Sequence, residues 1–165
     1  MINIQEVDAL IFDFDGVLTD NGVYVNESGC EQVRCSRADG LAFDVFRKLG
    51  TKVWILSTEK NRVVSKRAKK LNTPVLQGVK NKVDGLNKLA QEEGIHLSRV
   101  LYVGNDLNDY HAMQLCGYSA CPADSHPVIK GIAKFPLITK GGMGIAREII
   151  EDVLGIDIIK TLYVS

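Results

Sequence analysis

Two carboxylates one residue apart, Asp13 and Asp15, follow an apolar run near the N-terminus and are the residues best suited to chemistry. The run from Leu10 to Phe12 is short and rich in β-forming residues, which predicts a buried strand of a parallel sheet. Two like charges beside a core require compensation by a metal ion, a cation or a proton. Turn aspartates at a strand end are the alternative interpretation, but the spacing Asp-x-Asp-Gly favours a metal-dependent site, placed where open α/β sheets bind ligands.

Further polar groups stand where other predicted strands end. Ser57 could bind phosphate together with the N–H groups at a helix start, or could simply cap that helix. Lys82 begins a predicted helix, a position where a lone lysine is usually solvated. Asn105, Asp106 and Asp109 form a cluster of oxygen ligands of the kind that Mg²⁺ prefers.

Strands alternate with helices through the rest of the chain, which predicts right-handed βαβ units. The expected fold is therefore α/β, a doubly wound, Rossmann-like parallel sheet flanked by helices, in a single domain over residues 1–165. The predicted strands after the first are 52–58, 74–77, 100–103 and 118–121. The predicted helices are 39–49, 60–71, 82–93, 107–116 and 144–153.

One segment lies outside this alternation. Residues 22–26 and 30–35 alternate apolar with polar side chains around the polar loop 26–29, a pattern that predicts a β-hairpin inserted after the first strand. A two-stranded hairpin is barely stable alone, so its apolar side chains need a covering surface, which could be the chain's own core.

Charge and composition narrow the class of protein. The chain has 20 basic and 20 acidic residues, which argues against nucleic-acid binding or membrane-surface binding driven by net positive charge. No apolar stretch approaches the ~18 residues of a membrane span, and the N-terminus lacks the layout of a signal peptide, so we expect a cytoplasmic protein. Neither their spacing nor a nearby histidine supports a zinc site, so the four cysteines are predicted to be free thiols: Cys30, Cys35, Cys116 and Cys121.

The stretch D-F-D-G-V-L-T-D at positions 13–20 resembles the signature of the haloacid dehalogenase-like phosphatases. Its long form ending in Thr-Asp is similar to that of the small subclass that has no cap domain. The resemblance extends in order to Ser57, Lys82 and the motif after Gly104, and so covers the four motifs of the family over nearly the whole chain.

The resemblance implies a set of catalytic roles. Asp13 would be the nucleophile that forms an aspartyl-phosphate, and Asp15 the acid that protonates the leaving oxygen and then activates water. Lys82 and Ser57 would hold phosphate oxygens. The metal would be Mg²⁺, bound by Asp13, by the backbone carbonyl of Asp15 and by the later oxygen cluster, whose members are Asn105, Asp106 and Asp109.

One position departs from the family pattern. The residue after the glycine of the last motif is commonly Asp, but here it is Asn105, whose amide oxygen can bind Mg²⁺ without contributing charge. Metal affinity is therefore expected to fall unless Asp106 or Asp109 compensates, and weak activity is one open outcome.

Within the capless group, the chain resembles the phosphatases of 3-deoxy-octulosonate 8-phosphate and of nonulosonate 9-phosphates, which implies a small sugar phosphate as substrate. Glu59 stands where the octulosonate enzymes usually have Arg. Arg67 and Lys70 share one helix face and could bind a substrate carboxylate, although a basic run is more often a solvated face. The predicted substrate-binding residues are Ser57, Thr58, Glu59, Arg67, Lys70 and Asp39.

The resemblance also implies a homotetramer, in which the hairpin packs against other subunits and, with the C-terminal tail at 160–165, borders a neighbour's active site. A nonulosonate 9-phosphate is the favoured substrate, and 3-deoxy-D-manno-octulosonate 8-phosphate is the alternative. The second alternative is a weakly active, phosphatase-like tetramerisation module associated with a cytidylyltransferase.

Overall fold

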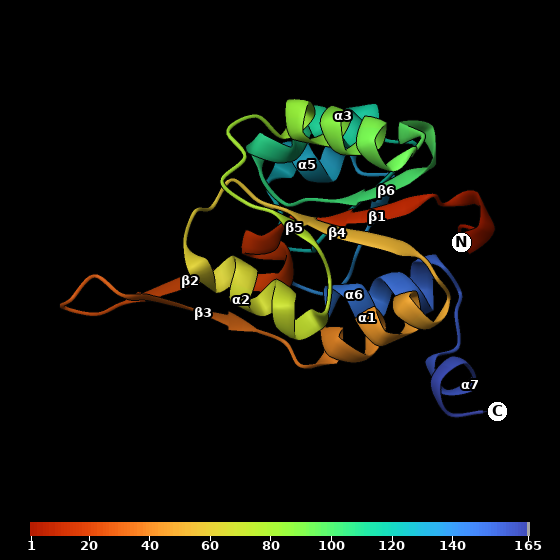
Figure 1. Cartoon of the computed structure of the whole chain (residues 1–165), viewed down its shortest axis with the longest axis horizontal. Helices are drawn as coiled ribbons and strands as arrows, with labels where there is room; N and C mark the ends of the chain where they lie inside the picture. Colours follow the sequence, from red (N-terminus) through yellow and green to blue (C-terminus); the bar gives the residue numbers. More distant parts are fainter. Residues whose placement is uncertain (165) are drawn as a thin grey trace.

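A six-stranded parallel sheet forms the centre of the computed structural model, which describes residues 1–164 (Figure 1). The strand order is β5-β4-β1-β6-β7-β8, so the first strand lies in the middle of the sheet. The strands are β1 (Ala9–Phe12), β4 (Lys52–Leu56), β5 (Val75–Leu76), β6 (Val100–Val103), β7 (Tyr118–Cys121) and β8 (Phe135–Pro136). This arrangement confirms the predicted α/β fold with a doubly wound sheet.

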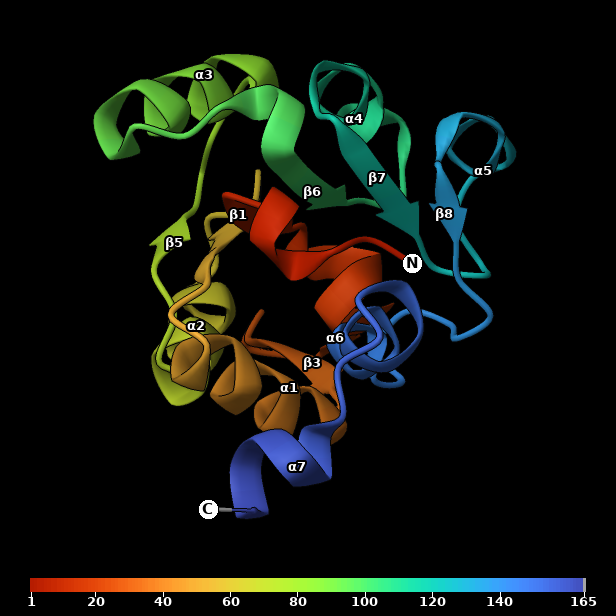
Figure 2. The same cartoon turned by 90° about the vertical axis from the view of Figure 1, so that its right-hand side faces the viewer.

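Helices cover both faces of the sheet. Figure 2 shows α3, α4 and α5 on one face and α1, α2 and α6 on the other, with α7 beyond α1. The α-helices are α1 (Ala38–Lys48), α2 (Arg62–Leu71), α3 (Lys82–Glu93), α4 (Tyr110–Leu115), α5 (Pro127–Ile132), α6 (Ile145–Glu148) and α7 (Ile158–Tyr163).

The central strand is buried on both faces. From β1, Leu10 and Phe12 pack into the apolar cluster beneath α1 and α2, whereas Ala9 and Ile11 pack into the cluster beneath α3 and α4. The Phe12 ring lies 5.5 Å, between ring centroids, from that of Phe43 in α1. Burial of each large apolar side chain contributes about 1.5–3 kcal/mol, so both clusters hold the position at which β1 ends.

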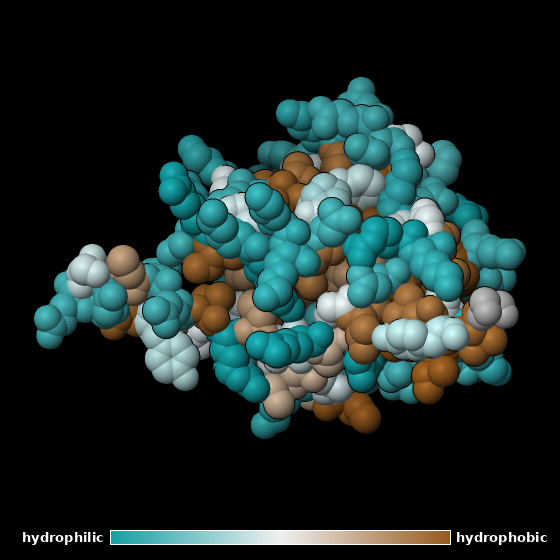
Figure 3. Space-filling model, turned by 60° about the horizontal axis from the view of Figure 1, so that its bottom comes forward, coloured by the Kyte–Doolittle hydropathy of each residue, from teal (hydrophilic) through white to brown (hydrophobic). Residues whose placement is uncertain are grey.

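The predicted hairpin is present as β2 (Thr19–Val25) and β3 (Glu31–Cys35). Its loop is closed by Asn26, whose Oδ1 accepts hydrogen bonds from the N–H groups of Ser28 and Cys30. The hairpin projects from the body of the molecule (Figure 3), and Tyr24 near its tip is 68% exposed. The chain's own core therefore covers only the base of the hairpin, where Val33 and Cys35 pack against it, and leaves the apolar side chains near the tip exposed.

Several details differ from the expectation. The helix predicted at 144–153 begins as α6 and continues as a wider π-helical turn, Ile149–Val153. The elements β8, α5 and α7 have no counterpart among the predicted segments. All four cysteines are free thiols, as predicted. Within residues 1–164, no helix has both the length and the apolar character needed to cross a bilayer.

Candidate active site

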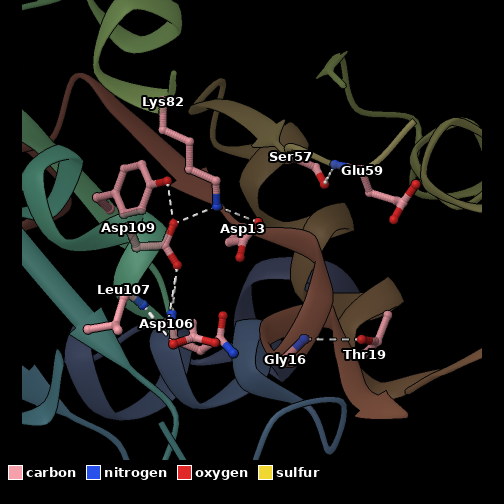
Figure 4. A network of polar contacts seen from close by, with 11 residues as sticks. Asp13, Gly16, Thr19, Ser57, Glu59, Lys82, Asp106, Leu107 and Asp109 are labelled. Atoms are coloured by element: carbon pink, nitrogen blue, oxygen red, sulfur yellow. Dashed lines mark hydrogen bonds and ion pairs between the residues drawn. The ribbon is translucent and has the colours of Figure 1, made fainter. Parts of the chain in front are cut away.

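The parallel register brings the predicted site residues to one edge of the sheet. Phe12, the last residue of β1, pairs with Ile55 of β4 on one side and with Val103 of β6 on the other. Since the three strands end together, the residues that follow them, including Asp13 and Ser57, share this edge (Figure 4). The sequence prediction that these motifs meet is confirmed at the level of the fold.

Lys82 reaches this edge from the first turn of α3. Its Nζ lies 2.8 Å from Asp13 Oδ1 and 2.6 Å from Asp109 Oδ1, and its side chain is 1% exposed (Figure 4). Burial alone would lower the pKa of Lys82, but the two carboxylates outweigh burial and raise that pKa. Burial raises the pKa of Asp13 to about 7, and Asp109 adds to this rise while Lys82 opposes it. The result is a buried, charged cluster rather than a solvated lysine.

Asp109 differs from its expected role as a metal ligand. Its Oδ1 accepts hydrogen bonds from Lys82 and from the hydroxyl of Tyr102, the latter at 2.8 Å. Its Oδ2 accepts from the N–H groups of Asn105 at 2.9 Å and Asp106 at 3.4 Å. Both oxygens are thus engaged by protein donors, so the contacts fit a residue that positions Lys82 and the loop after β6.

Asp15 stands in a turn that the backbone holds tightly. The turn Phe14–Leu18 contains Gly16 at φ +77°, and the Gly16 N–H donates to Thr19 Oγ1 at 3.1 Å. Burial, and then the nearby Glu59 carboxylate, raise the pKa of Asp15, which suits a group that must carry a proton to a leaving oxygen. A cavity of about 370 Å³ opens here, lined by Asp13, Asp15, Asn21, Thr58, Asn105, Asp106, Leu107 and Asn108.

The side-chain amide of Asn105 tests whether the site fits a cation. One terminal atom of this amide lies 2.9 Å from the backbone oxygen of Asp15 and 3.2 Å from Asp13 Oδ2. If that atom is nitrogen, it donates to both oxygens. If it is oxygen, three oxygens face one another and need a cation between them. Ligand oxygens around octahedral Mg²⁺ lie about 3 Å apart, given metal–oxygen distances near 2.1 Å, so the donor set fits this ion.

The ligands of a metal at this site would have to include groups other than acidic side chains. Within the described residues, no three His, Cys, Asp or Glu side chains converge on a point that could hold a metal. The candidate metal ligands are therefore the carboxylate of Asp13, the backbone carbonyl of Asp15 and the side-chain amide of Asn105. Asp106 borders the same cavity, but its Oδ1 already accepts the Leu107 N–H at 2.7 Å.

Ser57 and its neighbours follow β4 at the same edge of the sheet, and Thr58 is the residue of this segment that lines the cavity. The Ser57 side chain is buried and its Oγ accepts the Glu59 N–H at 3.1 Å, which leaves the hydroxyl able to donate its own hydrogen to an anion. Thr58 is exposed and lines the cavity. The Glu59 carboxylate accepts the N–H groups of Lys60 at 2.6 Å and Asn61 at 2.7 Å, so the backbone fixes the position of this carboxylate, whose charge acts on Asp15.

Arg67 and Lys70 do not line this cavity. They border a separate groove of about 430 Å³ between β3 and α2. The Arg67 guanidinium also donates from Nη2 to the carbonyl of Ser36 at 2.6 Å. The two basic residues predicted to bind the substrate carboxylate are therefore together, but apart from Asp13 of their own chain.

Asp39 was predicted to bind substrate, but the structure places it away from the residues that line the cavity of Asp13. Its side chain is 0% exposed, and Oδ1 accepts the N–H of Ala146 at the start of α6, at 3.0 Å. Burial raises the pKa of Asp39 to about 6, although Arg67 and Arg147 act in the opposite direction. Its contacts join α1 to α6 and do not reach the cavity.

Two residues that support the site were not predicted from the sequence. Tyr102 supplies the hydroxyl on Asp109, and its signal was a single polar group inside a strand that is otherwise aliphatic. Thr19 belongs to the motif at 13–20, and its Oγ1 accepts the N–H groups of both Gly16 and Asn21, which ties the turn to the base of the hairpin.

Comparisons with known proteins agree with this geometry. The family described as haloacid dehalogenase-like hydrolase matches residues 47–149. The 3-deoxy-D-manno-octulosonate 8-phosphate phosphatase KdsC of Escherichia coli is 31% identical over 92% of this chain and 81% of its own. The N-acylneuraminate cytidylyltransferase A of Danio rerio is 28% identical over 91% of this chain, which corresponds to 35% of that protein.

A solved structure is similar over the same range. It is the 3-deoxy-D-manno-octulosonate 8-phosphate phosphatase of Moraxella catarrhalis in complex with magnesium, phosphate and KDO. Its TM-score is 0.87 at 27% identity, over 92% of this chain and 88% of that one. By the matched family and these relatives, the chain belongs to the haloacid dehalogenase-like hydrolases, among the phosphatases that lack a cap domain.

Proposed function

We propose that this protein is a Mg²⁺-dependent phosphomonoesterase that acts on a 2-keto-3-deoxy sugar acid phosphate. The observation that carries the proposal is the buried contact of Lys82 with Asp13, beside a cavity that Asp15 also lines. A lysine placed on a carboxylate in this way can neutralise an incoming phosphoryl group while it holds the carboxylate in position for attack.

The proposed reaction has two steps. Asp13 attacks phosphorus and forms an aspartyl-phosphate, while the bond to the substrate oxygen breaks and Asp15 donates its proton to that oxygen. Asp15, now a carboxylate, removes a proton from water. The water oxygen bonds to phosphorus, the bond to Asp13 breaks, and inorganic phosphate leaves. Both carboxyl groups return to their starting state, so the cycle balances.

Asp13, the backbone carbonyl of Asp15 and Asn105 are the proposed Mg²⁺ ligands, with Asp106 at the edge of the same cavity. When bound, the metal supplies positive charge that offsets repulsion between the carboxylates and the phosphate. Lys82 and the Ser57 hydroxyl, supported by Thr58, are proposed to hold the remaining phosphoryl oxygens. Asp109 is proposed to position Lys82.

We further propose that the preferred substrate is a nonulosonate 9-phosphate, such as KDN-9-phosphate or N-acetylneuraminate-9-phosphate. Glu59, whose charge acts on Asp15, would accept hydrogen bonds from sugar hydroxyls, and Arg67 with Lys70 would bind the carboxylate. The alternative substrate is 3-deoxy-D-manno-octulosonate 8-phosphate, which is named in the relatives. Glu59 distinguishes the two, because an arginine usually stands at this position in the octulosonate enzymes that the sequence resembles.

A homotetramer would unite the two halves of this site. Arg67 and Lys70 line a groove separate from the cavity that Asp13 lines, and in the proposed tetramer a second copy of the chain would bring such a groove to each cavity. The exposed apolar hairpin provides a surface for that copy, since Val23 is 52% and Val25 is 64% exposed. The tail at 160–165 was expected to take part. Its described residues lie in and after α7, and residue 165 lies outside the described residues.

A second candidate function rests on two observations. Asn105 brings no charge to the metal site, and the chain is similar to about a third of a cytidylyltransferase. Both support a weakly active module that assembles a larger enzyme of nine-carbon sugar acids. A cytoplasmic location is proposed for either function.

Phosphate release from a panel of substrates tests the proposal. The panel contains nonulosonate 9-phosphates, octulosonate 8-phosphate and p-nitrophenyl phosphate, each with and without Mg²⁺. We expect Mg²⁺-dependent release that is fastest with a nonulosonate 9-phosphate. Fastest release from octulosonate 8-phosphate would favour the alternative substrate. Release near background throughout, from a folded protein, would favour the assembly module.

A further inference from the structure

A buried glutamate outside the catalytic motifs holds the loop that supports the catalytic turn. Glu148 lies on α6 and is 8% exposed. Its two carboxylate oxygens accept the N–H groups of Ile138 and Thr139, each at 2.8 Å. Because one carboxyl group accepts two successive backbone N–H groups, this pair of hydrogen bonds joins the start of the loop at 138–144 to α6.

The same loop contacts the catalytic turn through its backbone. The Gly142 N–H donates to the carbonyl of Val17 at 2.9 Å. A Cβ on Gly141 would lie 2.2 Å from the carbonyl oxygen of Gly16, and one on Gly142 would lie 2.4 Å from the backbone N of Asp20. The two chain segments are therefore packed backbone to backbone, and movement of the loop must move the turn.

The position of α6 makes this connection direct. Figure 2 shows the turn Phe14–Leu18 beside α6, and the two elements pack against each other. Asp124 supplies a second anchor, because its Oδ1 accepts the Gly141 N–H at 2.9 Å. Asp124 is exposed, so its anchor is the weaker of the two.

We propose that Glu148 is a positioning residue for the proposed phosphatase reaction, acting through the loop at 138–144 on the turn that carries Asp15. The proposal rests on the proposed role of Asp15. Asp13 has an independent support in Lys82, whereas the turn that carries Asp15 is hydrogen-bonded to Thr19 and to this loop, and its Asp15 carbonyl also faces the amide of Asn105. Loss of Glu148 therefore displaces the proton donor more than the nucleophile or the phosphate contacts.

Glu148→Gln tests this role with little change of shape. An amide offers one oxygen to two N–H donors and turns its NH₂ group toward the second, so the loop loses one anchor. We expect kcat for p-nitrophenyl phosphate to fall on the order of 10- to 100-fold, because a misplaced Asp15 activates water poorly, while kcat/KM changes less than about 2-fold, because this leaving group needs no proton donor. Glu151→Gln, on an exposed glutamate of the same helical segment, is the matched control and should keep wild-type kcat.

Hydrogen exchange of backbone amides distinguishes a local effect on the loop and the turn from a loss of global stability, which would raise exchange throughout the fold. In Glu148→Gln, exchange should rise at 138–142 and at 16–19, while β1 keeps its protection. An unchanged kcat, or faster exchange confined to 138–142, would overturn the proposal. Should Glu148→Gln fail to fold, Asp124→Ala removes the acceptor of the Gly141 N–H and should lower kcat to a smaller extent, again with kcat/KM retained. The Asp13→Asn variant separates the proposed reaction from the proposed role of Glu148. Activity retained in that variant would refute the reaction itself.

Discussion

Replacement of Lys82 by methionine should damage both stability and activity, because this lysine is the only cation in contact with two buried carboxylates among the described ion pairs. Its Nζ lies 2.8 Å from Asp13 and 2.6 Å from Asp109, and the three side chains are at most 6% exposed. Removing one member of a buried charge network costs about 3–5 kcal/mol, since the remaining charges lose their partner. The methionine keeps most of the side-chain volume, so cavity formation adds little.

Urea unfolding measures this cost. With a slope of ~2 kcal/mol per molar, the midpoint of Lys82→Met should fall by about 2 M. Lys80→Met is the matched control, since Lys80 is exposed two residues away and should shift the midpoint little. Phosphatase activity should fall on the order of 10²–10³-fold through loss of charge stabilisation. A stability loss below about 1 kcal/mol, like that of an exposed ion pair, would refute the inferred burial of this network.

Three further changes have definite expected outcomes. Burial raises the pKa of Asp39 from 3.8 to about 6, so the folded state binds this proton more tightly and the contribution of Asp39 to the free energy of unfolding should fall by about 2 kcal/mol from pH 4 to pH 6. Asp39→Asn should remove that fall, and parallel pH profiles of the two proteins would contradict it. Asn105→Asp should lower the Mg²⁺ concentration for half-maximal activity several-fold, and an unchanged titration would exclude Asn105 as a ligand. Val25→Asp should shift the protein to smaller assemblies in light scattering and should reduce turnover of a sugar phosphate more than that of p-nitrophenyl phosphate. A wild type that is a monomer with full sugar selectivity would contradict the tetramer.

The sheet could be predicted from sequence because its strands are short, apolar and regularly separated by helical patterns. The convergence of Asp13, Ser57 and Asn105 followed from the rule that parallel strands end together. The strand β8 could not be predicted, since two residues, Phe135–Pro136, carry no periodicity and depend on their neighbour β7 for hydrogen bonds.

Burial of polar residues was the harder problem. Asp39 meets Ala146 across 107 positions, and no local pattern links the two. Asp109 and Asn105 both carry side-chain oxygens and lie in one cluster of the sequence. From the sequence alone it could not be predicted which of them contacts Lys82 and which faces Asp15. Such assignments depend on the direction of each side chain, which only the folded loop determines.

The central claim is that Asp13 is the nucleophile, and its covalent intermediate is the most direct test. Asp15→Asn should still accept a phosphoryl group from a substrate with a good leaving group, such as p-nitrophenyl phosphate, but should release it slowly because no base activates water. After acid quench and proteolysis, mass spectrometry should find phosphate on Asp13 in this variant and none at that position in Asp13→Asn. If the wild-type protein turns over substrate but Asp15→Asn never carries phosphate on Asp13, or carries it on another residue, the proposed mechanism is wrong.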